Sequence, residues 1–174
     1  SFLPTIETGG GHRFLVGLHP EFVIDSVKRK NAKIILFDGA IADVSQVDRL
    51  FNECHEQDIT CVIVSKEFGN DVISTINANN KRKTLDIIPI VITDKIENIN
   101  TINDISVCTG GTVINSDTGI RLSNIDVQDV KTIYDFVATK SYFDVSSSPE
   151  MNDAISKKIE VIKDRIQKAH IFDN

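Results

Sequence analysis

The hydrophobic positions of this chain form two kinds of pattern that alternate along its first half. Continuous apolar runs, typical of strands buried on both faces, occur at Ile34 to Phe37, Thr60 to Val64 and Ile87 to Ile92. Between them, Val44 to Gln57 and Asp71 to Arg82 carry apolar residues three and four apart, with Asp43 and Asn70 as expected N-caps. Because strands and helices alternate, we predict an α/β domain with a largely parallel sheet.

The second half continues the alternation with shorter elements. Isoleucines at every third position from Ile96 to Ile105 predict a helix, which Gly110 ends. Further elements are expected as strands at Val113 to Ile114 and Thr132 to Val137, a polar turn or helical connector at Ile125 to Val130, and a final helix over residues 149–170. Residues 1–13 are predicted to be a flexible, turn-rich lead-in, and Pro89 predicts an edge position or a bulge for its strand.

Composition and charge narrow the class of protein. The 174 residues have the length of one domain, and a net charge of -6 provides no basic field for a polyanion, so we expect no nucleic-acid partner. The nearest thing to a basic cluster is Lys81-Arg82-Lys83. Twenty-six isoleucines, with no Trp and two Tyr, predict a core of branched aliphatic side chains.

The chain contains neither a run of about 18 apolar residues nor a charged and then apolar leader. We therefore expect no membrane partner and a cytoplasmic location. Cys54, Cys61 and Cys108 lie in apolar runs and are expected to be buried free thiols. Since the chain begins at Ser1 rather than Met, we expect it to be part of a longer protein.

Candidate chemistry is sparse. Gly9-Gly10-Gly11 lacks the preceding strand that a phosphate loop requires, and Gly110-Gly111 follows a helix end, where the dipole repels anions. The histidines are scattered without a metal-ligand spacing, at His12, His19, His55 and His170. No catalytic set emerges, and we predict a domain that binds a partner, with no cofactor of its own.

On a helical wheel, two large apolar residues lie at the margins of the stripes that the helices would bury. Phe51 lies at the margin of a stripe centred on Val47, and Ile73 is displaced from Val72 and Ile76. We predict that Phe51 and Ile73 are incompletely buried, either because they widen the core stripe or because they contact a partner.

The segment Asp104 to Asn115, with its Thr109-Gly110-Gly111-Thr112-Val113-Ile114 motif, resembles the apical domain of group I chaperonins, the GroEL-like ring proteins. The similarity continues through Gly119-Ile120-Arg121-Leu122 and Asp126 to Val130. Upstream, the predicted elements from Ile34 to Arg82 keep the family's lengths and spacing, and Gly17 to Phe22 is similar to the family's Gly-Tyr-Leu-Ser-Pro-Tyr-Phe segment. The resemblance covers the chain from about Phe14 to near its end.

This resemblance implies a single apical, polypeptide-binding domain over residues 1–174, with the family's swivelling β/β/α fold. A mixed sheet is then flanked by helices, and a C-terminal helix leads toward an intermediate domain. Non-native polypeptide, and a co-chaperonin loop, would bind in a groove between two short helices. Carried over by position, the polypeptide-binding residues are Leu18, Phe22, Asp48, Phe51, Ile73, Asn77 and Ala78.

The resemblance also implies properties of an intact protein. That protein is expected to be a homo-oligomeric ring and an ATPase that uses ATP and magnesium at a site outside this chain. The chain itself is then expected to be a monomer and not an enzyme.

Several departures from the family's pattern weaken the expected binding. Glu21, Asp48 and Asn77 stand where the family commonly has apolar residues, and each lost aliphatic anchor forfeits on the order of 1.5 to 3 kcal/mol of burial. The family's Pro-Gly-Phe-Gly loop is replaced by Ile92 to Ile96. We therefore expect weak or selective capture by a divergent chaperonin, such as a phage-encoded one acting in the host cytoplasm.

Two alternatives stay open on the sequence. One is a small α/β enzyme with its site at the carboxyl ends of the strands, near Asp38, Ser65 and Thr93, although such residues are also ordinary turn formers. The other is a structural domain that has lost client binding. Peptide binding that is abolished by Phe51→Glu or Ile73→Glu distinguishes the chaperonin hypothesis from both.

Overall fold

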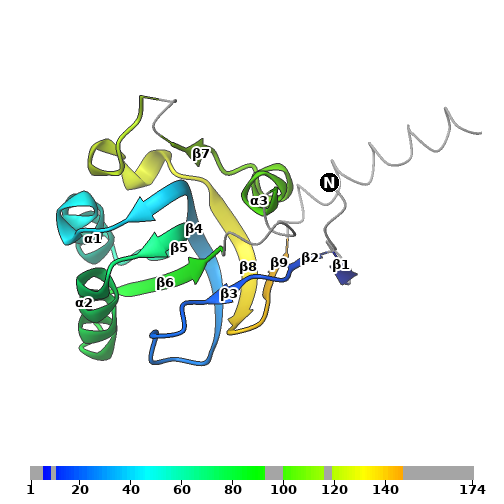
Figure 1. Cartoon of the computed structure of the whole chain (residues 1–174), viewed down its shortest axis with the longest axis horizontal. Coiled ribbons are helices and arrows are strands. Elements are labelled where there is room, and N and C mark those ends of the chain that lie inside the picture. Colours follow the sequence, from blue (N-terminus) through cyan, green and yellow to red (C-terminus); the bar gives the residue numbers. More distant parts are fainter. Residues whose placement is uncertain (1–5, 9–10, 93–99, 116–118, 147–174) are drawn as a thin grey trace, which may run out of the picture.

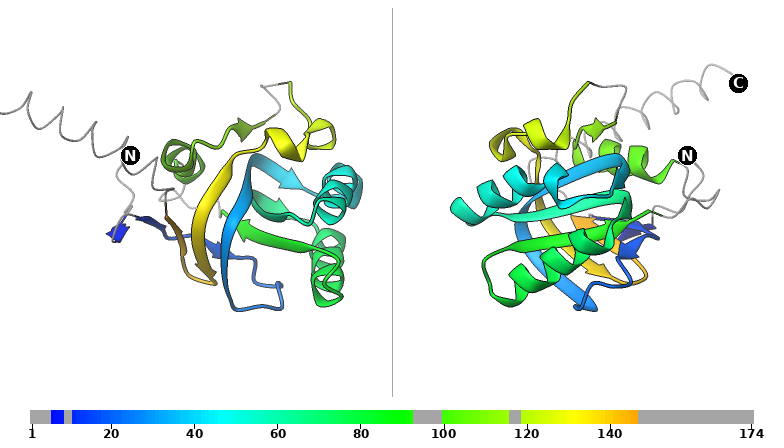
Figure 2. Two further views of the ribbon diagram at one scale, coloured as in Figure 1. Left: turned by 180° about the vertical axis from the view of Figure 1, so that it is seen from behind. Right: turned by 60° about the vertical axis from the view of Figure 1, so that its left-hand side comes forward.

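A computed structural model describes residues 6–8, 11–92, 100–115 and 119–146 as one mixed sheet with helices on both sides (Figure 1). Helices α1 (Asp48–Glu56) and α2 (Asn70–Lys81) cover one face of the sheet, whereas α3 (Thr101–Thr109) lies on the opposite side (Figure 2). The predicted α/β fold with a mixed, helix-flanked sheet is confirmed. The predicted helix over residues 149–170 lies outside the described residues.

Within the described residues the sheet has nine strands, with the order β1-β2-β9-β8-β4-β5-β6-β3 and β7 paired beside β4. The strands are β1 (Ile6–Thr8), β2 (Gly11–Phe14), β3 (Gly17–Leu18), β4 (Ser26–Ile41), β5 (Thr60–Phe68), β6 (Asp86–Val91), β7 (Val113–Ile114), β8 (Thr132–Thr139) and β9 (Phe143–Ser146). Strand β4 pairs with β8 along its first half and with β5 along its second, where β7 replaces β8 on the other flank. This strand therefore joins the two halves of the sheet.

The direction of each strand pair follows from its connection. Helical connections place β4, β5 and β6 parallel to one another, as predicted. Strands β8 and β9 are joined by a short turn, closed by the Thr139 N–H donating to the Tyr142 carbonyl at 2.9 Å, and are therefore antiparallel. Pairings of β1, β2, β3 and β8 are antiparallel as well. The prediction of a largely parallel sheet from the alternating pattern was wrong, whereas the mixed sheet implied by the family resemblance is found.

In the described part of residues 1–13, where a turn-rich lead-in was predicted, the chain forms strands that the sequence pattern did not reveal. Strands β1 and β2 form an antiparallel hairpin there, with Thr8 opposite Gly11, and β2 pairs with β9. The sequence of β2, Gly-His-Arg-Phe, shows little apolar alternation and so did not predict a strand. The strand forms because its backbone pairs with β9, which is distant in the sequence. The first half of β4, Ser26 to Lys33, was also missed, because it is ordered by pairing with β8, which lies far later in the chain.

Local signals located most helix ends correctly. Asp43 accepts a hydrogen bond from the Ser45 N–H at 3.0 Å, and Gln46 closes a capping box. The predicted helix from Val44 is nevertheless divided, because a 3-10 turn (η1, Val44–Gln46) precedes α1. Gly69 rather than Asn70 is the N-cap of α2. Gly110 ends α3 in the left-handed region at φ 78°, as predicted.

Pro89 was predicted to mark an edge strand or a bulge, but its strand β6 lies between β5 and β3 in the sheet. On the flank away from β5, β6 is paired with the two residues of β3, and beyond them the Pro89 carbonyl accepts the His19 N–H at 2.9 Å. The missing N–H of proline therefore leaves no ladder partner unpaired on that flank.

The core is built from branched aliphatic residues, as the composition predicted. Cys54 and Cys61 are buried free thiols, but Cys108 on α3 is only half-buried, which corrects the prediction for that residue. Among the described helices, none has the length and apolar character needed to cross a membrane.

Candidate functional site

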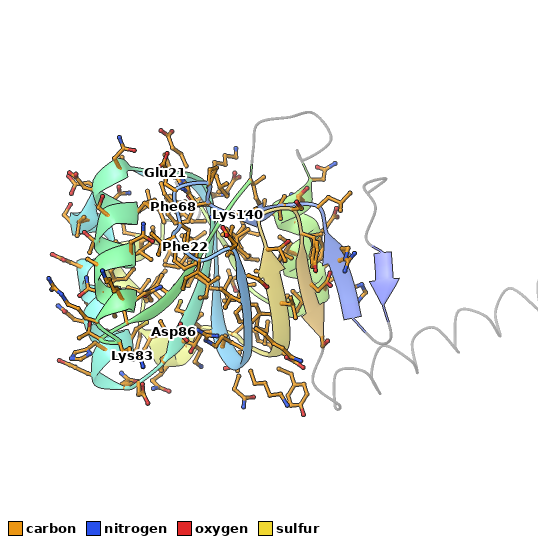
Figure 3. All side chains as sticks on the ribbon, turned by 90° about the horizontal axis from the view of Figure 1, so that it is seen from below. Glu21, Phe22, Phe68, Lys83, Asp86 and Lys140 are labelled. Atoms are coloured by element: carbon orange, nitrogen blue, oxygen red, sulfur yellow. The ribbon has the colours of Figure 1, made fainter. Side chains whose placement is uncertain are left out.

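The surface with the most predicted binding residues is formed by α1, α2 and the loop that follows β3. We call the residues of this loop from His19 to Val23 the 19–23 loop. Figure 3 shows Glu21 and Phe22 of this loop gathered with Phe68 and Lys140. The loop, Phe68 and Lys140 come from three different parts of the sequence, so only the fold brings them together.

Four of the predicted binding residues lie in the core. Leu18 and Phe22 are both 2% exposed, Phe51 is 5% exposed and Ile73 is 3% exposed. The prediction that Phe51 and Ile73 are incompletely buried was therefore wrong. A helical wheel over residues 44–57 assumes one continuous helix, but the 3-10 turn η1 has three residues per turn and shifts the phase before α1 begins.

The other predicted residues lie at the surface and are polar or small. Asp48, in the first turn of α1, and Ala78 on α2 are exposed, and Asn77 is half-buried. The Asn77 side chain bonds the 19–23 loop twice: its amide nitrogen donates to the Glu21 carbonyl at 2.9 Å, and its carbonyl oxygen accepts the Val23 N–H at 3.1 Å. Asn77 thus joins the loop to α2.

Val23 is a surface residue of this site that the sequence did not reveal. Its side chain is 67% exposed, although it is aliphatic and follows the buried Phe22. No periodic pattern marks Val23, because the 19–23 loop is irregular and its conformation depends on contacts with α2, β6 and the turn after β8. The exposed apolar group of this site is therefore Val23, in a loop, and not a residue at the margin of a helix.

Lys140, in the turn between β8 and β9, holds the loop from the other side. Its ammonium donates to the carbonyls of His19 at 2.8 Å and Phe22 at 2.6 Å, and lies 5.8 Å from the centre of the Phe22 ring. Desolvation lowers the pKa of Lys140 below its ordinary value, and the nearby charges of Asp25 and Glu21 offset part of this effect.

His19 completes the inner side of the loop. Its Nδ1 accepts the Glu21 N–H at 3.0 Å, and its ring packs edge-on against Phe68 with 5.8 Å between ring centres. Desolvation lowers the pKa of His19, with a smaller opposing effect from Glu21. An imidazole that accepts a hydrogen bond at Nδ1 must be unprotonated there, which agrees with this direction.

Gly17, just before the loop, allows the close approach of the turn that carries Lys140. A Cβ atom on Gly17 would lie 2.2 Å from the Lys140 carbonyl oxygen, a contact that neither backbone segment could relieve without moving. Glycine is therefore required for β3 to pass this turn.

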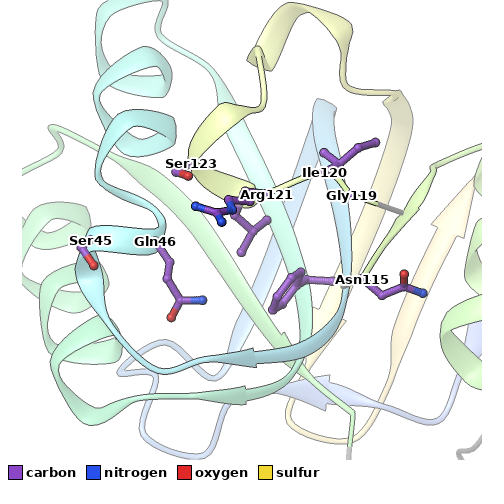
Figure 4. Close-up of a pocket in the computed structure, with 9 residues that line it drawn as sticks. Ser45, Gln46, Asn115, Gly119, Ile120, Arg121 and Ser123 are labelled. Carbon is purple, nitrogen blue, oxygen red and sulfur yellow. The ribbon is translucent and has the colours of Figure 1, made fainter. Parts of the chain in front are cut away.

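Other cavities lie away from the predicted binding residues. One of them, of about 650 Å³, is lined by residues of η1 and of the segment around Arg121 (Figure 4). Gln46, on its wall, already accepts the N–H groups of Ala42 and Asp43 through its side-chain oxygen. That oxygen therefore serves the start of the helix and is not left unpaired in the cavity.

The residues suggested for an enzyme site have structural partners. The Asp38 carboxylate pairs with the Lys66 ammonium at 2.9 Å, and the Ser65 hydroxyl lies 2.7 Å from the Gly39 carbonyl oxygen. Thr93 lies outside the described residues. Across the part of the chain that the structure describes, no cluster of three or more His, Cys, Asp or Glu side chains could hold a metal ion. The geometry therefore gives no support to catalysis at this edge.

Known proteins that resemble this chain include chaperonins and a RuBisCO large subunit-binding protein. No family model matches the chain. The RuBisCO large subunit-binding protein subunit beta of Pisum sativum is 25% identical over 157 residues, which cover 87% of this chain and 26% of that protein. Chaperonin GroEL 1 of Prochlorococcus marinus (strain MIT 9313) is 24% identical over 149 residues, covering 83% of this chain and 26% of that protein. The chain thus spans about a quarter of the length of these relatives.

A solved structure shows the same fold. The chaperonin gp146 from the bacteriophage EL 2 (Pseudomonas aeruginosa) matches with a TM-score of 0.63 at 13% sequence identity, over 92% of this chain and 33% of that one. The fold described above therefore occurs as about one third of a larger protein.

Proposed function

We propose, for a chain that is homologous to the GroEL/chaperonin 60 proteins over most of its length, that it is the polypeptide-binding apical domain of a chaperonin. The observation that carries this proposal is the similarity over 157 residues, or 87% of the chain, to a protein of which it spans only 26%. The proposed domain comprises residues 1–174, with residues 149–170 leading toward an intermediate domain.

The intact protein has further proposed properties. It assembles into a homo-oligomeric ring in the cytoplasm, or in the host cytoplasm if a phage encodes it, and it hydrolyses ATP with magnesium. Its nucleotide site lies outside this chain, which by itself is a monomer without enzymatic activity. Non-native polypeptides are its clients, and a co-chaperonin loop competes for the same surface.

The proposed binding surface consists of the exposed sides of α1 and α2 together with the 19–23 loop. Asp48 and Asn77 give it polar groups and Ala78 a small one, whereas Leu18, Phe22, Phe51 and Ile73 are buried. Val23 supplies the exposed aliphatic contact. Burying one valine side chain contributes about 1.5 kcal/mol, or roughly tenfold in affinity, so capture through this surface is weak or selective.

Fluorescence anisotropy of a labelled, permanently unfolded probe tests this function. Reduced and carboxymethylated α-lactalbumin is titrated with the 174-residue chain, and native α-lactalbumin serves as the control. We expect saturable binding of the unfolded probe with a dissociation constant on the order of micromolar or weaker, and no binding of the native probe. Absence of binding at every ionic strength would instead favour a domain that has lost its clients, and ATP turnover by the chain would contradict the assignment.

A further inference from the structure

We infer that Lys140 is a positioning residue that presents Val23 as the main apolar anchor for a client polypeptide. This inference rests on the proposed function, since it concerns how the same surface captures its client. Lys140 itself lies behind the loop, with its ammonium directed at carbonyls of the 19–23 loop rather than at the proposed partner.

The backbone of the loop is held almost completely by hydrogen bonds within the protein. The N–H of His19 donates to Pro89, and the N–H of Phe22 donates back to the His19 carbonyl, both at 2.9 Å. The His19 ring accepts the N–H of Glu21, and Asn77 bonds both Glu21 and Val23. A client can therefore not add to this loop as a further strand through these groups, and contact must occur through side chains.

The role of Lys140 follows from the carbonyls that it bonds. The His19 and Phe22 carbonyls begin and end the turn that precedes Val23, and the ammonium draws both to within 2.8 Å of itself. The same ammonium lies 5.8 Å from the centre of the buried Phe22 ring, so that one group contacts both the ring and the turn. A partly desolvated ammonium depends on these carbonyls for its hydrogen bonds, because less water reaches it.

The consequence for Val23 is a fixed position at the surface. Its N–H is held by Asn77 and the residue before it by Lys140, while the side chain remains 67% exposed. An ordered apolar group loses little conformational entropy on binding, so more of its burial contributes to affinity. Val23 in this setting selects clients with an exposed aliphatic or aromatic side chain.

The experiment measures affinity for carboxymethylated α-lactalbumin in four variants of the 174-residue chain. Val23→Asp is expected to weaken binding about tenfold or more, whereas Val107→Asp, at an aliphatic residue of α3 that is 84% exposed, leaves it unchanged. Lys140→Met is expected to weaken binding severalfold and to speed amide exchange of residues 19–23. Lys140→Arg, which can still donate to both carbonyls, restores most of the affinity.

A double variant separates positioning from general destabilisation. If Lys140 acts through Val23, then Lys140→Met has no further effect on affinity in the Val23→Asp background, because coupled residues are not additive. Where Lys140→Met does not fold, Asn77→Ala replaces it in the same cycle.

The outcomes distinguish this inference from the proposed function. Wild-type binding that neither Val23→Asp nor Lys140→Met changes would overturn the inference and leave the proposed function standing. Additive losses in the double variant, or unchanged amide exchange in Lys140→Met, would overturn the role of Lys140 alone. Failure of the wild-type chain to bind the probe would reject both proposals.

Discussion

At the scale of single residues, the site depends on polar side chains that bond backbone groups. Asn77 and Lys140 each bond two backbone groups of the 19–23 loop, and the His19 ring accepts the Glu21 N–H within the same loop. Replacing such a side chain by an apolar one removes the protein partner of these backbone groups. The asparagine that was expected to weaken a groove therefore has a structural role in ordering the loop.

His19 makes the stability of the domain depend on pH. Its pKa is lowered in the folded state, so the unfolded chain binds the proton more tightly and protonation favours unfolding. The contribution of His19 is fully present above its ordinary pKa of 6.5 and is lost as the pH falls through the lower folded value. We expect the free energy of unfolding in urea to decrease between pH 7.5 and pH 5.

His19→Asn provides the comparison for this prediction. Asparagine keeps an oxygen acceptor near the Glu21 N–H but does not titrate, so the variant should lose part of the decrease between pH 7.5 and pH 5. Parallel stability curves for the wild type and the variant would show that His19 does not cause the pH dependence.

At the scale of elements, the approach to α1 is determined by a local hydrogen-bond motif. Asp43 and Gln46 form a capping box, and the Gln46 side chain also accepts the Ala42 N–H at 2.9 Å. This motif starts η1, which precedes α1 and sets which of its residues face the core. The burial of Phe51 therefore depends on a turn that lies outside α1 itself.

Loss of this capping motif should destabilise the domain measurably. Asp43→Ala removes the acceptor for the Ser45 N–H and should lower the free energy of unfolding by about 1 kcal/mol. Asp48→Ala, at an exposed carboxylate in the first turn of α1, is the matched control and should cost only about 0.3 to 1 kcal/mol at low salt, decreasing as salt is added. Equal, salt-insensitive losses in urea unfolding of both variants would contradict a specific role for the capping box.

At the scale of the whole molecule, β4 connects all parts of the sheet. Leu36 pairs with Val64 of β5 on one flank and with Val113 of β7 on the other, and Ser26–Lys33 pair with β8. The middle of β4 and of β5 is also buried, with Leu36 and Val64 fully inaccessible. Opening β4 requires separation of both halves of the sheet.

Native-state hydrogen exchange tests this arrangement. We expect the amides of Ile34 to Leu36 and Val62 to Val64 to exchange only by global unfolding, with the free energy that urea unfolding gives. Amides of the β1–β2 hairpin, at one edge of the sheet, should exchange through local opening with a lower free energy. Faster exchange in β4 than in the hairpin would contradict the central role of β4.

The sequence by itself determined the elements whose signals are local. Buried strands appear as apolar runs, helix starts as capping residues such as Asp43, and the end of α3 as the left-handed Gly110, because each depends on neighbours within a few residues. The family resemblance, which extends along most of the chain, also predicted the mixed sheet. Strands β1, β2 and β9, which lie together at one side of the sheet, were missed, because the weakly patterned β2 and β9 pair with each other across most of the chain.

Only the tertiary structure decided which residues of the proposed site are exposed. Phe51 and Ile73 lie at the margins of their helical stripes, and neighbouring elements bury them. Val23 is exposed because Asn77 and Lys140, which are 54 and more than 100 residues away in the chain, hold the loop around it. The exposure of a residue depends on every element that packs against it. A periodic pattern describes only the face of the residue's own helix or strand.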